Sequence, residues 1–426
     1  MSVGVAVRAL SSSQSLYVPP PPIPSEARVV VMGGGIIGTS VAYHLAHSGV
    51  KDVVLLERDQ LTSGTTWHAA GLMVTFGSLS ETSTDMRKYT KQLYGSLEAE
   101  TGQSTGFMPV GFIEVATNTD RLEEYRRIAA FNRKCGVDVR EVSPAEVQAL
   151  FPLARVDDVL AGFYVEDDGR VNPVDATMAL AKGARAQGAT ILEGVSVADV
   201  TTRGGAVTGV VATRRVEGTG AAFEDPQMEE RQHIRADYVV NCGGMWARQL
   251  AESHGPKGVI VPNQAAEHYY LLTEPMDDVD PSWPVLEDPS SYAYIRPEGG
   301  GLMVGLFEGR GAAWKVDVGI PSSFSFGEIE PDWDRLGPYL EQAMGRVPRT
   351  LEVGAKKFFC GPESFTPDLG PVVGESPELR NYFVAAGLNS IGILTGGGVG
   401  RAVAHWVKTG LPDVDVTGMN VDRFQV

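Results

Sequence analysis

A glycine-rich turn between two hydrophobic segments is the first feature of this sequence with chemical meaning. A strand predicted at 29–32 leads into Gly33-x-Gly35-x-x-Gly38 and a helical stretch, and a second predicted strand ends at Glu57, nineteen residues after the last glycine. Such glycines let the backbone approach a pyrophosphate, and the helix N-terminus offers N–H groups to its charge. A carboxylate after the second strand can accept hydrogen bonds from ribose hydroxyls. The sequence therefore predicts a dinucleotide-binding unit.

A histidine follows this unit, and its position helps to distinguish a flavin from a nicotinamide dinucleotide. His68 lies eleven residues beyond Glu57 and directly after Trp67. The glycine pattern alone fits a nicotinamide as well as a flavin, and it also occurs in glycine-rich turns of other doubly wound domains. Taken alone, His68 is equally a core or loop histidine, but it stands where the ring system of a flavin would lie.

A second strand–glycine–helix pattern closes the sequence. The strand predicted at 382–385 is followed by Gly387 and then by Gly396-Gly397-Gly398, and we expect the next helix to begin near Gly398. The positive end of that helix could stabilise the negative charge that a reduced flavin carries near N1 and O2. The alternative is that these glycines only permit close helix packing.

Composition excludes several classes of protein. The chain has 426 residues and a net charge of -17, which disfavours nucleic acid and anionic membranes as partners. No apolar run is long enough to predict a membrane span. The three cysteines, Cys135, Cys242 and Cys360, lack the spacing of a disulfide framework or a zinc site and indicate a reducing compartment.

The first 25 residues differ from the rest of the sequence. Arg8 carries the only charged side chain among them. Serines cluster around 11–15, and Pro19–Pro22 form a stiff run. Such a segment resembles a mitochondrial transit peptide, so we expect residues 1–25 to be disordered and the protein to reach the mitochondrial matrix. A plain disordered tail on a cytoplasmic protein is the alternative.

Longer segments resemble a known family, the amine-oxidising flavoproteins that include the sarcosine and dimethylglycine dehydrogenases. Residues 56–72 around His68 match the flavin-attachment segment of that family, and residues 360–368 resemble the sarcosine dehydrogenase branch in particular. The resemblance covers about residues 27–424. It implies FAD as the cofactor, joined covalently through a ring nitrogen of His68 to the 8α carbon. The 8-methyl group of the oxidised flavin can lose a proton, and a neutral imidazole can then attack the electrophilic 8α carbon that results.

The resemblance also implies the further contacts of the flavin. Besides the glycines of the first turn, Glu57 and His68, we expect the cofactor site to contain Arg58, Thr65, Thr66, Ala70, Gly71, Val197, Gly243, Gly387, Asn389, Gly396, Gly397 and Gly398. Cys360 is the rival tether, since related monomeric sarcosine oxidases attach their flavin through a cysteine in a comparable late position. Because the Trp67–His68 motif is intact, we expect Cys360 to be a packed small residue.

The implied fold is α/β, with an FAD-binding Rossmann-like domain of the glutathione-reductase and DAO type, interleaved with an antiparallel-sheet substrate domain. We expect the FAD-binding domain at 27–100, 160–255 and 350–424. The substrate domain is expected at 101–159 and 256–349, where short strands rich in aromatic residues replace the strand–helix alternation.

The implied reaction is oxidative demethylation of a small N-methyl amino acid, with sarcosine as the first candidate and dimethylglycine as the next. The hydride would pass from the N-methyl carbon to flavin N5, and the electrons then to electron-transferring flavoprotein or oxygen. His268 and Tyr294 match positions that line the family's active site. Strand alternation places Arg296 on the face of Tyr294, which makes it a candidate partner for the substrate carboxylate. Core packing for the aromatic positions and a surface ion pair for Arg296 are the alternatives.

One departure from the family is large. Its dehydrogenases continue into a C-terminal half resembling aminomethyltransferases, which binds tetrahydrofolate, and this sequence ends at Val426 without it. We therefore expect no folate site in this chain and formaldehyde as the second product; a truncated sequence is the alternative. A non-catalytic relative, the regulatory subunit of pyruvate dehydrogenase phosphatase, shares the architecture, and the intact His68 favours an enzyme over such a regulator. A nicotinamide dehydrogenase is the third possibility.

Overall fold

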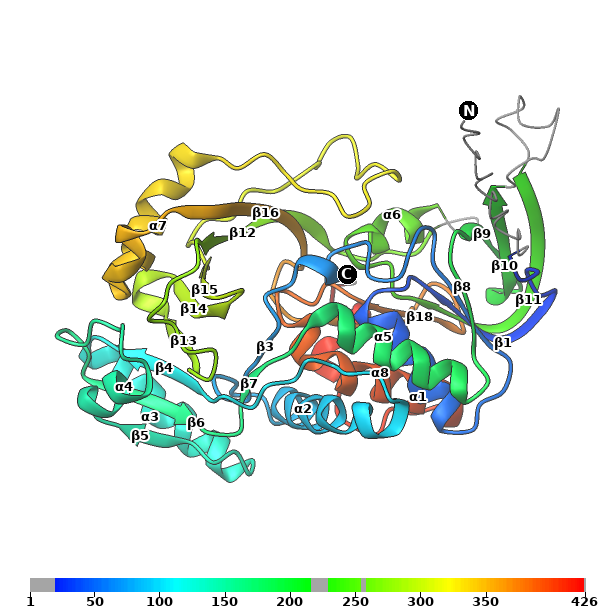
Figure 1. Cartoon of the computed structure of the whole chain (residues 1–426). Helices are drawn as coiled ribbons and strands as arrows, with labels where there is room; N and C mark the ends of the chain where they lie inside the picture. Colours follow the sequence, from blue (N-terminus) through cyan, green and yellow to red (C-terminus); the bar gives the residue numbers. More distant parts are fainter. Residues whose placement is uncertain (1–19, 216–228, 254–257, 425–426) are drawn as a thin grey trace, which may run out of the picture.

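The computed structural model describes residues 20–215, 229–253 and 258–424. Within this part of the chain, two eight-stranded sheets and one two-stranded sheet carry the fold. Figure 1 shows the two large sheets at opposite ends of the molecule, with a layer of helices beside the first. The predicted α/β class is confirmed.

The first sheet is built around the glycine-rich turn. Strand β1 (Glu26–Met32) pairs in parallel with β2 (Val53–Leu56), and the chain passes between them through helix α1 (Ile36–His47). The parallel part of the sheet is completed by β8 (Thr190–Leu192) beside β2, by β11 (Glu229–Asn241) beside β1 and by β18 (Tyr382–Ala386) beside β11. The antiparallel strand β17 (Val372–Glu375) closes it. The carboxyl ends of β1 and β2 therefore meet at one edge, where such sheets bind ligands.

Helices cover one face of this sheet and a β-layer covers the other. On the helical face, α1 packs against α5 (Pro173–Ala186) and α8 (Gly392–Thr409), and α8 also packs against α2 (Glu81–Thr101). On the other face, β9 (Ser196–Arg203) pairs with β10 (Ala206–Arg215), and β10 pairs with the first half of β11. The alternation of β1 explains both layers, since Val29 and Val31 belong to the helical core and Val30 and Met32 to the other.

Helix α8 begins earlier than the sequence predicted. It starts at Gly392, so the expected start near Gly398 is wrong, and the three glycines lie inside the helix. An added Cβ at Gly398 would lie 2.5 Å from the Cα of Met86, and one at Gly397 would lie 3.0 Å from the Cα of Thr90. These glycines let α8 approach α2 closely, which was the alternative explanation for them.

The second sheet is mixed where an antiparallel one was expected. Its order is β16 (Ala355–Phe365), β12 (Gln264–Thr273), β15 (Gly301–Leu306), β14 (Ala293–Glu298), β13 (Val285–Asp288), β4 (Phe112–Ala116), β6 (Ala161–Val165) and β5 (Arg140–Val142). All neighbours are antiparallel except β13 and β4, which come from distant segments and pair in parallel. Strands β6 and β16 lie in ranges that we had expected for the FAD-binding domain, yet they pair in this sheet.

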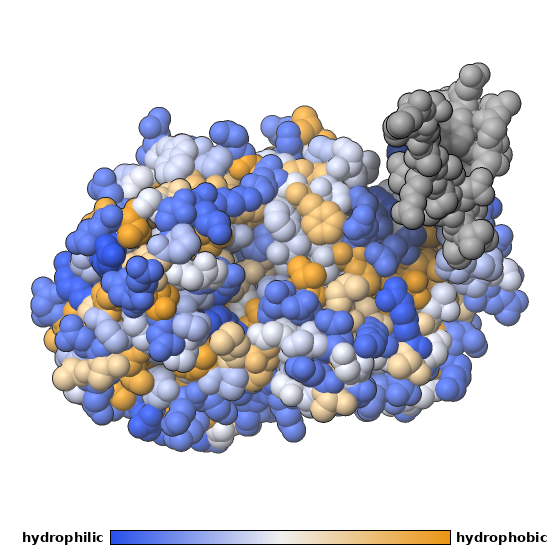
Figure 2. Space-filling view, viewed as in Figure 1, coloured by the Kyte–Doolittle hydropathy of each residue, from blue (hydrophilic) through white to orange (hydrophobic). Residues whose placement is uncertain are grey.

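Short elements complete the described structure. Helices α3 (Thr119–Lys134), α4 (Pro144–Leu150) and α7 (Trp333–Arg346) accompany the second sheet, α6 (Ala247–Glu252) follows β11, and β3 (Leu72–Met73) pairs with β7 (Gly169–Arg170). The single-turn helix at Thr66–His68 carries the candidate tether. No helix of the described residues is long and apolar enough to cross a membrane. The face shown in Figure 2 is mostly hydrophilic, with apolar residues scattered over it.

Two sequence predictions concern segments at the edge of the described structure. Residues 1–19 of the possible transit peptide lie outside the described residues, whereas Ile23 is buried in the core beside β10. The charged, mainly acidic sequence around 224–231 predicts a loop between two strands. Residues 224–228 lie outside the described residues, and residues 229–231 form the start of β11.

The helix contact at Gly398 can be tested by substitution. We expect Gly398→Ala to lower the unfolding temperature, since forcing a methyl group against the α2 backbone costs about 1–3 kcal/mol. Gly345→Ala in α7 is the matched control, because an added Cβ there meets nothing within 4 Å. It should leave the unfolding temperature unchanged or raise it slightly. Thermal unfolding of the two variants compares them, and equal midpoints would contradict the tight α8–α2 contact.

Candidate active site

The glycine-rich turn forms one wall of an open cavity at the carboxyl edge of the first sheet. Gly33 has a φ of +107°, and an added Cβ there would lie 2.5 Å from the carbonyl oxygen of Cys242. An added Cβ at Gly38 would overlap the carbonyl oxygen of Gly33. Only glycine fits at these two positions, and the result is that the N-terminus of α1 opens directly onto the cavity.

Glu57 holds the turn in place and faces the same cavity. Its carboxylate accepts hydrogen bonds from the backbone N–H groups of Gly34 at 2.6 Å and Asp59 at 2.8 Å. Burial raises the pKa of Glu57, and the two backbone donors counteract this rise. Because each carboxylate oxygen has a second lone pair, Glu57 keeps acceptor capacity for hydroxyl groups of a ligand in the cavity.

Arg58 adds a cation to this cavity. Its guanidinium carbon lies 4.4 Å from the centroid of the Trp246 ring, and both side chains line the cavity wall. The Nε of Arg58 is buried and has no hydrogen-bond partner in the described part of the chain. A buried N–H without a partner is unusual in a folded protein, and here it is positioned for a ligand acceptor.

A strained loop leads into α8 and borders the cavity. Gly387, Asn389 and Ser390 have φ values of +62°, +47° and +64°, a region that residues with side chains seldom adopt. The Asn389 side chain holds the loop by accepting a hydrogen bond from the Thr366 N–H at 2.8 Å and donating one to the Gly387 carbonyl at 2.6 Å. The Ser390 hydroxyl donates to Glu363. Such strain persists where surrounding contacts fix a site for function.

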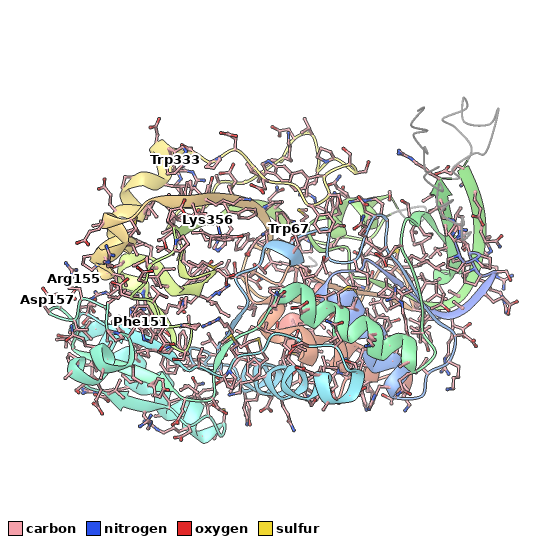
Figure 3. All side chains as sticks on the ribbon, viewed as in Figure 1. Trp67, Phe151, Arg155, Asp157, Trp333 and Lys356 are labelled. Atoms are coloured by element: carbon pink, nitrogen blue, oxygen red, sulfur yellow. The ribbon has the colours of Figure 1, made fainter. Side chains whose placement is uncertain are left out.

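His68 lies where this cavity meets a second one. It is 6% exposed, and its Nε2 has no hydrogen-bond partner among the described residues. Burial, together with the charge of His268, lowers the pKa of His68 to about 3. The imidazole is therefore neutral, with a lone pair free on one ring nitrogen. Its ring centroid lies 5.1 Å from that of Phe359 and 5.5 Å from that of Trp67, which Figure 3 places between the helical layer and the second sheet.

Cys360 lies on the other side of the second sheet. In β16, Phe359 lines the second cavity, and the next residue, Cys360, points to the opposite face, where it packs with Tyr269. Cys360 is 1% exposed, and burial raises the pKa of its thiol to about 12. Neither its position nor its protonation state suits attack on a ligand in the cavity.

The second cavity has a volume of about 300 Å³ and lies on the second sheet. Its floor is a row of directly paired residues that crosses six strands: Phe359, Tyr270, Gly305, Tyr294, Glu287 and Glu114. We call this the cross-sheet row. It is aromatic at the end near His68 and acidic at the other end. His68, His268, Arg87 and the start of α8 complete the walls.

Two of the three predicted substrate residues line this cavity. The ring of Tyr294 covers Gly305. The hydroxyl group of Tyr294 is buried and has no hydrogen-bond partner among the described residues. The ring centroid of Tyr294 lies 5.2 Å from that of Phe307. His268 packs on the other side of Phe307, with centroids 5.3 Å apart. Arg296 lines neither cavity. Its guanidinium donates to the Ala70 carbonyl at 3.0 Å and pairs with Glu298, so it supports the His68 segment instead of facing a substrate.

The expected cofactor residues divide into three groups. Those that line the first cavity are Gly33, Gly35, Glu57, Arg58, Thr65, Thr66, Val197, Gly243, Gly387 and Asn389, and those that line the second are His68, Ala70, Gly71 and again Asn389. Gly38, Gly396, Gly397 and Gly398 line neither. Sequence reasoning missed Trp246 and Ser390, whose positions beside Gly243 and Asn389 were the available signals, and it missed Arg87, Glu114 and Glu287 in the second cavity.

The comparisons with known proteins agree with this geometry. A model of the FAD dependent oxidoreductase family, DAO, matches residues 28–406. The chain belongs to this family. The glycine cradle and the two buried nitrogens without partners, on Arg58 and His68, fit a flavin dinucleotide. FAD is therefore the cofactor that the site is built for, and the expected glutathione-reductase and DAO type of fold is confirmed.

Individual relatives cover most of this chain. It is 39% identical to mitochondrial sarcosine dehydrogenase of Mus musculus over 95% of its length and 42% of that protein. It is 38% identical to a formaldehyde-forming 4-methylaminobutanoate oxidase of Paenarthrobacter nicotinovorans, over 98% of this chain and 48% of that one. The mitochondrial pyruvate dehydrogenase phosphatase regulatory subunit of Mus musculus is 36% identical over 94% and 44%. The chain thus spans less than half the length of these relatives.

A solved structure shows the same fold. L-proline dehydrogenase from P. horikoshii superimposes with a TM-score of 0.80, covering 94% of this chain and 98% of that one at 23% identity. At this identity the likeness concerns the fold alone.

The position of Cys360 predicts its reactivity. In the native protein, we expect an alkylating reagent at mildly alkaline pH to label Cys135, which is partly exposed, well before Cys242 and Cys360, which are buried. Burial raises the pKa of both buried thiols, so almost no thiolate is present. Mass spectrometry of digested samples gives the order, with denatured protein as the control in which all three react. Early labelling of Cys360 would contradict its placement.

Proposed function

We propose that this chain oxidises small N-methyl amino acids and that its FAD is attached covalently through His68. The observation that carries the proposal is the neutral, buried imidazole whose Nε2 has no partner, at the junction of the two cavities. The cavities share Ala69, Glu363, Asn389 and Ser390 in their walls, so a single extended cofactor can occupy the first and reach the second. Placement of the thiol of Cys360 on the far face supports histidine over cysteine as the tether.

The residues of the chain have separate tasks in this proposal. The N-terminus of α1 would hold the pyrophosphate and Glu57 the ribose hydroxyls. When bound, FAD supplies the two-electron acceptor for a hydride. Tyr294 and His268 would position the amine against it, with Tyr294 as a hydroxyl donor because burial raises its pKa and keeps it protonated. Oxidation of an amine requires its neutral form, in which the lone pair on nitrogen is free.

The proposal extends to the substrate, the electron acceptor and the location in the cell. Sarcosine and then dimethylglycine are the candidates from the sequence, and the name of one relative adds 4-methylaminobutanoate. We propose electron-transferring flavoprotein or oxygen as the acceptor, formaldehyde as the product of the methyl group, and the mitochondrial matrix as the location, since several relatives are named as mitochondrial. A role as a regulatory subunit is the second candidate, favoured only by the 36% identity to that relative.

One pair of absorbance spectra tests flavin and activity together. We expect the native protein to be yellow, its flavin absorbance to bleach anaerobically on adding an N-methyl amino acid, and the colour to stay with the pellet after acid precipitation. Glycine, which lacks the N-methyl group, is the control and should cause no bleaching. A flavin that is present but is not reduced by any N-methyl amino acid would contradict the enzyme proposal and favour the regulatory one.

The tether is tested by matched variants. His68→Ala should bind FAD without retaining it in acid, whereas Cys360→Ala should retain as much acid-stable flavin as the unmodified chain. Gly361→Ala should reduce acid-stable flavin, because its Cβ would lie 2.8 Å from the Cε1 of His68 and displace the ring. Peptide mass spectrometry locates the modified residue, and flavin mass on a peptide containing Cys360 would overturn the assignment.

A further inference from the structure

We propose that Arg87 binds the carboxylate of the substrate at the acidic end of the second cavity, and that this selects N-methyl amino acids whose carboxylate is several bonds away from the amine. The inference rests on the proposed function and defines its substrate class. It replaces Arg296, whose guanidinium is occupied by Ala70 and Glu298, as the carboxylate partner.

Arg87 is a cation that lines the second cavity and is held in place by a hydrogen bond. It comes from α2, and its Nη1 donates to the carbonyl of Phe76 at 2.9 Å, which fixes the direction of the guanidinium. Its Nε is buried and has no hydrogen-bond partner, and no carboxylate lies within 4.0 Å of it, among the residues that the structure describes. The residue as a whole is partly exposed, and a partly buried cation without a paired anion would be stabilised by an anionic ligand.

Arg346 is a buried arginine of this fold that has a purely structural role, and carboxylates neutralise its charge. Arg346 is 1% exposed, and its guanidinium binds Asp158 at 2.6 Å and Asp288 at 2.8 Å. Arg87 is less buried than Arg346, lines a cavity, and forms no ion pair in the described part of the chain. Arg170 is also buried without an ion pair in the described chain, but it lines neither cavity.

Two glutamates share the end of the cavity with Arg87 without neutralising it. Glu287 and Glu114 are paired residues of β13 and β4, and both line the cavity. Burial raises the pKa of Glu114 to about 7, and burial together with the charge of Glu114 raises that of Glu287 well above its usual range. At neutral pH at least one of the two is therefore a neutral acid, which can donate a hydrogen bond to a bound carboxylate. The positive charge of Arg87 remains available.

The cross-sheet row sets the length of ligand that this arrangement accepts. Tyr294, which would position the amine, is separated from Glu287 by one strand spacing and from Glu114 by two, about 5 and 10 Å. Arg87 lines the same cavity as both glutamates, so we place the proposed carboxylate site at this end of the row. The carboxylate of sarcosine is one carbon from its amine, a separation shorter than one strand spacing. An N-methyl γ-amino acid spans this interval better.

Substrates with matched structures test the length and the carboxylate separately. Anaerobic flavin reduction is measured with sarcosine, N-methyl-β-alanine, N-methyl-γ-aminobutyrate and N-methylbutylamine, which lacks the carboxylate. We expect KM to fall along the first three. Arg87→Met should raise KM for N-methyl-γ-aminobutyrate by about 10- to 100-fold, the value of a charge-assisted hydrogen bond, and leave N-methylbutylamine unchanged. Arg87→Lys should recover part of the loss. Arg170→Met is the matched control and should not change the preference for the carboxylate.

Binding without turnover separates this inference from the proposed function. Butyrate cannot be oxidised as an amine, and its binding is followed by the change in flavin absorbance. We expect Arg87→Met to weaken it by a similar factor with unchanged flavin content. If no N-methyl amine reduces the flavin but butyrate binding depends on Arg87, the proposed function fails and the carboxylate site stands. Equal loss for N-methylbutylamine and N-methyl-γ-aminobutyrate in Arg87→Met, or unchanged butyrate binding, would overturn the role of Arg87.

Discussion

The attachment of the His68 segment to both sheets is the constraint on which the whole site depends. On one side, the Thr66 hydroxyl accepts a hydrogen bond from the N–H of Ile36 at 3.1 Å, at the start of α1. On the other, the Ala70 carbonyl accepts from Arg296 of β14 at 3.0 Å. These two bonds flank His68 and hold it over Phe359. A shift of either sheet would therefore move the imidazole relative to the nucleotide cradle or to the substrate cavity.

The same attachment explains why His68 is neutral. Contacts with Trp67 and Phe359 exclude water from the ring, and no carboxylate forms a hydrogen bond or ion pair with it in the described part of the chain. Desolvation without a compensating charge favours the uncharged imidazole. An ion pair with a carboxylate would raise the pKa and leave the ring protonated, without a lone pair for bonding to carbon. Lack of a partner is thus a condition of the chemistry that we propose for this residue.

Local patterns in the sequence were sufficient to predict the glycine-rich turn and the role of Glu57 beside it. The tasks of Gly33, Gly38 and Glu57 follow from the turn itself, since the atoms that they contact lie within a short stretch of chain or in the neighbouring parallel strand. Gly398 and Arg296 were misjudged because their partners, Met86 and Ala70, are distant in sequence. Alternation correctly placed Tyr294 and Arg296 on one face, but it could not show that the cavity ends before Arg296.

Arg87 shows which signal in a sequence could have indicated the acidic end of the cavity. The buried residues of α2 include Thr84, Thr90, Tyr94 and Leu97, and Arg87 lies three residues from each of the first two, on the stripe that faces the core. A charged residue at such a position either forms an ion pair within the protein or binds a ligand. Because pairing depends on contacts across the fold, only the structure shows that Glu114 and Glu287 approach Arg87 without forming an ion pair with it. Arg87 of α2 lines the cavity together with Glu114 and Glu287 at the acidic end of the row, and His68 lies at the aromatic end, with Tyr294 between them. A ligand that carries an anion at one end and an oxidisable amine at the other complements both.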